Sequence, residues 1–219
     1  MRCEDRDRAF WERKAPHYDR VVTGVFGRPL PRVLELTAEG VSGAESVLEV
    51  AAGTGLMTAA IAPRVRRVVA TDYADAMLEH LRTRVAAAGF SNVECTPGDL
   101  YALNYPCGSF DRIVAGNVLH LVPDLPRALQ ALCHVLRTGG TLIAPTFCHD
   151  ETRLSWLVSR TLLAAMGQPM HRRFTAVTLR QALEQQSLRV TKCETVPGVI
   201  PITYVESVCE AGPAARSQP

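Results

Sequence analysis

Residues 47–55 read Val47-Leu-Glu-Val-Ala-Ala-Gly-Thr-Gly55, an apolar run that ends in a turn of small residues. The run predicts a strand over 46–50, and the pattern after the turn predicts a helix over 54–62. Small side chains let a ligand approach the backbone, and the N-terminus of the next helix offers unpaired N–H donors. A tight turn with positive φ would explain the same glycines without a ligand, so this segment alone leaves both interpretations open.

The spacing of the small residues excludes two common nucleotide motifs. A dinucleotide fingerprint, GxGxxG, aligned on Ala51 and Gly53 would place its third small residue where Leu56 stands. No phosphate-binding GxxxxGKS/T motif occurs, which excludes a P-loop nucleotide hydrolase. The pattern is instead acid-x-small-x-Gly-x-Gly, which here comprises Glu49, Ala51, Gly53 and Gly55.

Strand-like and helix-like segments alternate outward from this turn. Strands are expected at 67–71, 92–95, 110–115 and 141–144, and helices at 74–88 and 125–136. This alternation predicts parallel strands joined by crossover helices, which is a doubly wound α/β sheet. After two further helices, at 151–166 and 178–186, strands at 188–196 and 203–209 have a connection too short for a parallel pair. We therefore expect them to be antiparallel.

Polar residues follow three more of the predicted strands. Asp72 closes the second, Asp99 follows the third in Pro97-Gly-Asp-Leu100, and Asn117 follows the fourth. In an open α/β sheet, ligands bind outside the carboxyl ends of the strands, and an acid at Asp72 can accept hydrogen bonds from two ribose hydroxyls. Each acid taken singly is also an ordinary helix N-cap or turn residue. With Glu49, these residues predict one crevice.

These segments together resemble the class I S-adenosylmethionine-dependent methyltransferases, in the small-molecule branch of the ubiquinone and menaquinone type. The resemblance covers about residues 10–145 and is carried by VLEVAAGTG, ATDYADAML, GDLYAL, FDRIVAGNVLHLVPDLPRAL and LRTGGTLI. It implies a Rossmann-like, seven-stranded sheet, mostly parallel with an antiparallel last strand, and helices on both faces. Ala51 departs from the family, which commonly has Gly there.

The resemblance also implies S-adenosyl-L-methionine as the cofactor and assigns roles to residues. The amino-acid end of the cofactor would be held at the turn that comprises Glu49, Ala51, Gly53 and Gly55. Asp72 would hold the ribose. The adenine would lie beside Tyr73 and Met77, with Asp99 at its amino group and Leu100 at its ring face. Asn117 would face the methionine part of the cofactor, and Tyr18 would lie over the sulfonium.

The N-terminal segment around Phe10-Trp11 and His17-Tyr18 resembles the family's lid. An aromatic ring stabilises a cation, and a lid excludes water. The alternative is that Trp11 and Tyr18 only anchor a terminal helix. We predict one domain over 1–211, with lid helices at 1–40, a cofactor core at 45–145, acceptor cap helices at 146–187 and a strand pair at 188–211. Residues 212–219 are predicted to be a frayed tail.

Composition narrows the class of protein. The chain has 219 residues and a net charge of +2, so no broad basic surface for nucleic acid is evident. Seven scattered cysteines, without a CxxC pair, indicate reduced thiols in a cytoplasmic protein. No signal peptide or transmembrane run is visible. We expect no metal site, and the oligomeric state stays open.

The acceptor is the least determined feature. Methyl transfer from a sulfonium is an in-line displacement, and a general base is needed only for a hydroxyl or a protonated amine. His120 and His149 are the candidate catalytic residues, with His17 a third; each is also an ordinary loop histidine. An apolar stripe on helix 151–166, which includes Leu154 and Leu157, either packs on the sheet or caps an acceptor pocket.

We therefore expect a small, largely apolar acceptor. The basic run at 171–173 keeps open a phospholipid head group, and with it peripheral contact with lipid. A partner protein that binds the cofactor without catalysis also stays open. A nicotinamide-dependent reductase is disfavoured by Leu56.

Overall fold

The computed structural model describes residues 3–25, 27–165 and 167–210. The predicted tail at 212–219 lies outside these residues. The helices are α1 (Cys3–Lys14), α2 (Tyr18–Val25), α3 (Leu30–Val41), α4 (Leu56–Ile61), α5 (Asp75–Ala88), α6 (Leu125–Val135), α7 (Arg153–Val158) and α8 (Ala176–Glu184). The strands are β1 (Ser46–Val50), β2 (Arg67–Asp72), β3 (Val93–Pro97), β4 (Phe110–Val114), β5 (Leu136–Ile143), β6 (Thr146–Phe147), β7 (Leu188–Val196) and β8 (Ile202–Cys209).

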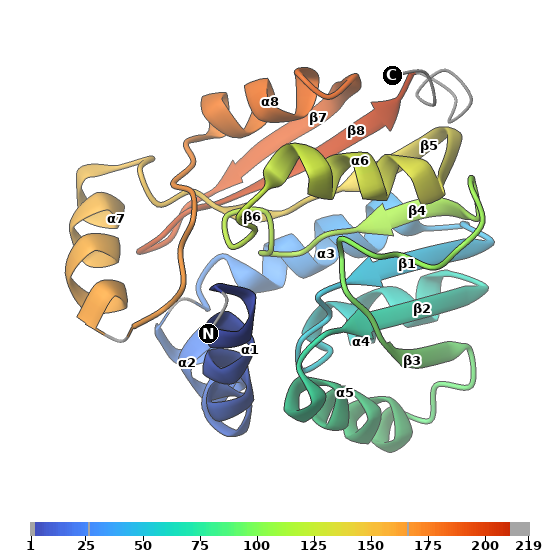
Figure 1. Cartoon of the computed structure of the whole chain (residues 1–219), viewed down its shortest axis with the longest axis horizontal. Coiled ribbons are helices and arrows are strands. Elements are labelled where there is room, and N and C mark those ends of the chain that lie inside the picture. Colours follow the sequence, from blue (N-terminus) through green and yellow to red (C-terminus); the bar gives the residue numbers. More distant parts are fainter. Residues whose placement is uncertain (1–2, 26, 166, 211–219) are drawn as a thin grey trace.

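One mixed sheet organises the molecule (Figure 1). Its order is β3-β2-β1-β4-β5-β8-β6, with β7 also paired to β8. The strands β1 to β5 are parallel, and β8 is antiparallel to β5, β6 and β7. The doubly wound fold and its antiparallel last strand are thus confirmed. The predicted strand count of seven is exceeded by β6, whose two residues pair with β8.

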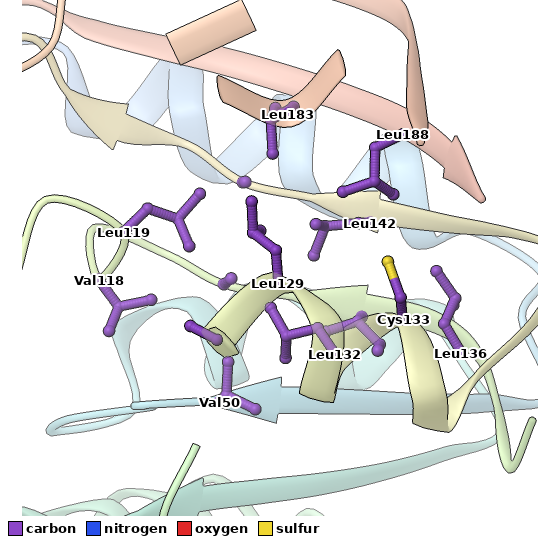
Figure 2. Close-up of a cluster of buried hydrophobic side chains, with 14 of the residues drawn as sticks. Val50, Val118, Leu119, Leu129, Leu132, Cys133, Leu136, Leu142, Leu183 and Leu188 are labelled. Atoms are coloured by element: carbon purple, nitrogen blue, oxygen red, sulfur yellow. The ribbon is translucent and has the colours of Figure 1, made fainter. Parts of the chain in front are cut away.

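Two apolar layers cover the faces of the sheet. On one face α6 packs through Leu125, Leu129 and Leu132, which are all buried. Figure 2 shows this cluster, where Leu129 and Leu132 lie near Leu142 of β5 and Leu183 of α8. The opposite face is covered by α3, α4 and α5. Because helices cover both faces, every central strand is buried, and ligands can reach the sheet only at its ends.

The N-terminal helices lie at the end of the sheet toward which β1 and β4 point (Figure 1). There α1 packs against α5 across the carboxyl ends of the strands. This is the position expected for a lid.

Helix α7 corrects an expectation. Leu154 and Leu157 are 55% and 51% exposed and line neither of the two cavities of the candidate active site, so these two residues of the apolar stripe do not pack on the sheet, whereas Val158 packs against the core. The inward face is formed instead by Ser155 and Ser159, each almost fully buried. A π-type turn, Ser159–Leu163, extends the helix and buries Leu163.

Candidate active site

The turn after β1 has the backbone conformation that its glycines predict. Gly53 and Gly55 have φ values of 57° and 84°. A Cβ on Gly55 would lie 2.6 Å from Cδ1 of Leu81 on α5, so this glycine permits helix packing. Ala51, where the resembling family commonly has glycine, also has a positive φ of 51°. An alanine in this region is strained, and the turn keeps the strain.

Asp72 ties the end of β2 to this turn. Its Oδ2 accepts a hydrogen bond from the backbone N–H of Gly53 at 2.8 Å, and its Oδ1 accepts one from Ala74 at 2.9 Å. The side chain is 5% exposed, and burial raises the pKa of its carboxyl. A carboxylate oxygen has two lone pairs, so each oxygen retains acceptor capacity for a ligand.

A first cavity of about 150 Å³ opens at this edge of the sheet. Nine of the eleven residues predicted for the cofactor line it: Tyr18, Ala51, Gly53, Asp72, Tyr73, Met77, Asp99, Leu100 and Asn117. Sequence reasoning missed several other lining residues, among them Asp7, Tyr101 and Val122. Tyr101 and Val122 lie inside GDLYAL and FDRIVAGNVLHLVPDLPRAL, so the family resemblance was a signal that could have found them, whereas Asp7 comes from α1, outside these segments.

Glu49 and Gly55 are not part of the cavity wall. Glu49 is 2% exposed, and its Oε2 accepts a hydrogen bond from Oγ1 of Thr58 at 2.7 Å. Burial raises the pKa of Glu49 to about 8, and the charge of Asp72 adds to the rise. Its side chain joins the end of β1 to α4, and direct contact with the cofactor stays a prediction.

Glu12 attaches helix α1 to the start of α5. Its two carboxylate oxygens accept hydrogen bonds from the N–H groups of Asp75 and Ala76, at 2.7 and 2.9 Å, at the start of α5. An acid is favourable there because the helix N-terminus carries unpaired donors.

Tyr18 begins α2 and lies beside the turn after β1, with its Cε1 4.0 Å from the position of a Cβ on Gly53. Burial, followed by the charges of Asp72 and Asp19, raises the pKa of Tyr18 to about 12. The phenol therefore stays neutral.

A second cavity, of about 380 Å³, adjoins the first. Both candidate histidines, His120 and His149, line it, as does His17. Its largely apolar wall includes Phe10, Val21, Val22, Phe147, Leu163 and Ile200. Four residues line both cavities and form a shared wall between them: Trp11, Tyr18, Asn117 and Leu121. Trp156, by contrast, is 45% exposed and lines neither.

Asn117 occupies a specialised position in that wall. It has a φ of 52°, a conformation that asparagine tolerates better than most residues. Its backbone N–H donates to the carbonyl of Pro145 at 2.7 Å, and its buried Oδ1 has no partner in the described part of the chain. An orphaned buried acceptor is expensive and indicates a ligand that supplies a donor or a charge.

Across residues 3–25, 27–165 and 167–210, no group of three or more His, Cys, Asp or Glu is arranged to hold a metal ion. Within the same residues, no helix is both long enough and apolar enough to cross a membrane.

A doubly wound sheet with an antiparallel strand beside β5, an acid at the end of β2 and a small-residue turn after β1 is the arrangement that the resemblance to the class I S-adenosylmethionine-dependent methyltransferases implied. A family model described as a methyltransferase domain matches residues 47–140. The chain is 32% identical over 163 residues to the ubiquinone/menaquinone biosynthesis C-methyltransferase UbiE of Teredinibacter turnerae, covering 68% of this chain and 66% of that protein. It is 36% identical over 101 residues to a demethylmenaquinone methyltransferase of Shouchella clausii, covering 45% and 43%.

A solved methyltransferase structure has a similar fold. The N-methyltransferase NodS of Bradyrhizobium japonicum, in complex with S-adenosyl-L-homocysteine, matches with a TM-score of 0.73 at 17% identity, covering 94% of this chain and 99% of that one. Residues 47–140 are therefore a methyltransferase domain, and the chain resembles the class I S-adenosylmethionine-dependent methyltransferases of the small-molecule branch in sequence and in fold. It spans less than two thirds of the length of the two curated relatives named above.

Proposed function

We propose that this chain transfers the methyl group of S-adenosylmethionine to a small, largely apolar acceptor by in-line displacement. The observation that carries the proposal is the shared wall of Trp11, Tyr18, Asn117 and Leu121 between the two cavities. In-line displacement requires donor and acceptor to meet on opposite sides of one carbon, and two adjoining cavities suit that requirement.

The first cavity fits the cofactor in its chemistry. The Asp72 carboxylate can accept from vicinal ribose hydroxyls, and the half-buried Tyr73 and Leu100 offer apolar surface to a purine. The unpartnered Oδ1 of Asn117 offers an acceptor to an ammonium or a sulfonium. When bound, the cofactor supplies an activated methyl group on a cationic sulfur, so the protein has to align the reactants and exclude water.

The lining of the second cavity favours an apolar acceptor. Aromatic and aliphatic walls with few polar groups are the usual lining of a small-molecule site. Arg13 and Lys14 also line this cavity. They favour a phospholipid head group as the second candidate acceptor, held by its phosphate at these cations.

Calorimetry and a mass-shift assay test the proposal together. The chain should bind S-adenosylmethionine and S-adenosylhomocysteine, and not NAD, and should add one methyl group to a member of a metabolite panel that includes phenols, quinols and phospholipids. Binding of NAD in place of S-adenosylhomocysteine would contradict the assignment. Tight cofactor binding with no methylated product in the panel would favour the non-catalytic alternative, and product only on phospholipid would favour the second candidate.

A further inference from the structure

Two buried histidines lie side by side in the wall of the second cavity. His120 follows β4 and His149 follows β6, and each is 1% exposed. Their ring centroids are 5.0 Å apart, and the ring of Phe147 lies 6.0 Å from each. Residues 29 positions apart are thus brought together at the carboxyl ends of neighbouring strands, because β4 pairs with β5 and the chain continues from β5 directly into β6.

The polar atoms of this pair are largely unpartnered. Nδ1 of His120 and both ring nitrogens of His149 have no hydrogen-bond partner among the described residues. Leaving a buried polar atom without a partner costs about 1–3 kcal/mol. Three such atoms on two touching rings, beside a cavity, are difficult to explain by packing alone. They indicate a polar group on the ligand of that cavity.

Both rings are neutral near pH 7. Burial, and then the neighbouring His149, lowers the pKa of His120 well below its ordinary value. Burial, and then the charge of Arg173, lowers the pKa of His149 to about 4. A neutral imidazole offers one N–H donor and one acceptor nitrogen. It therefore suits a neutral hydroxyl, which also donates once and accepts, and offers no charge to a carboxylate or a phosphate.

We infer that the acceptor carries a hydroxyl group on an aromatic or enolic carbon, and that the buried pair His120–His149 binds this hydroxyl and receives its proton. The inference rests on the proposed methyl transfer and names the class of its acceptor. An aromatic or enolic hydroxyl is required because an imidazole is too weak a base for an alkyl alcohol. The aromatic rings of Phe10, Trp11 and Phe147 in the same cavity fit a flat apolar body.

The step balances in atoms and charge. The bond between the acceptor oxygen and the methyl carbon forms while the bond from that carbon to sulfur breaks. The sulfur keeps the electron pair and leaves as a neutral thioether. The hydroxyl proton moves to a ring nitrogen of the pair. One positive charge is present in the site before and after, first on sulfur and then on an imidazolium, so burial opposes the proton transfer less than it would in an otherwise uncharged site.

Binding of two matched probes tests the inference without turnover. In the presence of S-adenosylhomocysteine, 2-naphthol should bind at least about tenfold more tightly than 2-methylnaphthalene, because only the naphthol fills the unpartnered positions. In His120→Leu and His149→Leu this preference should fall below about threefold, with the affinity for S-adenosylhomocysteine unchanged. His80→Leu, at an exposed position on α5 outside both cavities, is the matched control and should keep the preference.

A third variant separates binding from proton transfer and serves if the leucine variants fail to fold. His149→Gln keeps a donor and an acceptor but cannot take a proton. If His149 receives the proton, this variant should retain most of the preference for 2-naphthol and lose methyl transfer to hydroxyl acceptors. If His120 receives it, His120→Gln should show that result instead. Equal affinity of the parent for the two probes, or turnover retained in both glutamine variants, would overturn the inference. A parent that binds no S-adenosylhomocysteine would instead overturn the proposed function.

Discussion

The carboxylate of Asp72 and the backbone N–H of Gly53 are joined by a 2.8 Å hydrogen bond that links the first two strands of the sheet at their carboxyl ends. Gly53 can present this N–H because it adopts a φ of 57°. The same acid also accepts from Ala74, so one buried side chain connects the turn after β1 with the start of α5. The residue predicted to hold the ribose is therefore also a structural element of its own cavity.

This double role predicts how Asp72→Asn will behave. The amide oxygen can still accept one backbone hydrogen bond, so the fold should remain, whereas the charge-assisted bonds to the ribose are lost. Affinity for S-adenosylhomocysteine should fall about tenfold or more, since a hydrogen bond to a charged group contributes about 1.5–3 kcal/mol. Calorimetry measures the change.

Asp111→Asn is the control for that experiment. Asp111 also accepts two backbone hydrogen bonds, from Glu45 and Ser46, but away from both cavities. This variant should keep its cofactor affinity. Equal loss in the two variants would remove the ribose role from Asp72.

Ala51→Gly should stabilise the protein. The left-handed conformation costs alanine about 1–2 kcal/mol, and part of the gain is offset because glycine is more flexible in the unfolded chain. We expect the free energy of unfolding to rise by about 1 kcal/mol in urea titrations. The same change at Ala86, exposed within helix α5, should lower it by about that amount. Destabilisation at both positions would show that the turn is not strained at Ala51.

The raised pKa of Glu49 predicts that the stability of the protein declines between about pH 4.5 and pH 8. This pKa is raised to about 8 in the folded protein, against 4.5 as the ordinary value, so between these values the folded state holds a proton that the unfolded state has released. Stability is therefore fully present below pH 4.5 and declines as the pH rises toward 8. At 1.36 kcal/mol per pKa unit, the decline is about 3–5 kcal/mol.

Glu49→Gln should remove this decline, because the amide does not titrate and can still accept from Thr58. The difference in unfolding free energy between Glu49→Gln and the parent should grow by a few kcal/mol from pH 5 to pH 8.5. Glu45→Gln, at an exposed position, should follow the parent at every pH. Parallel curves for all three proteins would show that Glu49 is ionised in the folded state.

Phe147 and Trp156 should differ in their effect on the acceptor. Phe147 is 8% exposed and lines the second cavity, whereas the ring of Trp156 lies 45% exposed beneath the guanidinium of Arg160. Phe147→Leu should lower kcat/KM for the acceptor about tenfold, the scale of a lost apolar contact in a binding pocket, and leave cofactor affinity intact. Trp156→Ala should leave kcat/KM unchanged. A loss confined to Trp156→Ala would place the acceptor outside the second cavity.

The sequence by itself determined the class of the fold and much of the first cavity. The turn at 51–55, the alternation of strands and helices, and the positions of Asp72, Asp99 and Asn117 after their strands are local patterns. Parallel strands bring their carboxyl ends to one edge, so placing a residue after a strand also places it beside the cavity. This is why nine of the predicted residues line it.

Only the tertiary structure decided what depends on distant packing. It inserted β8 between β5 and β7, and it buried Glu49 against Thr58 of α4. It also turned Ser155 of α7 and the adjoining Ser159 inward while Leu154 and Leu157 stayed exposed. It also brought His120 against His149, and three of their ring nitrogens have no hydrogen-bond partner among the residues that the structure describes. Helical periodicity tells which residues share a face and not which face the rest of the chain will cover, because burial is set by segments far away in the sequence.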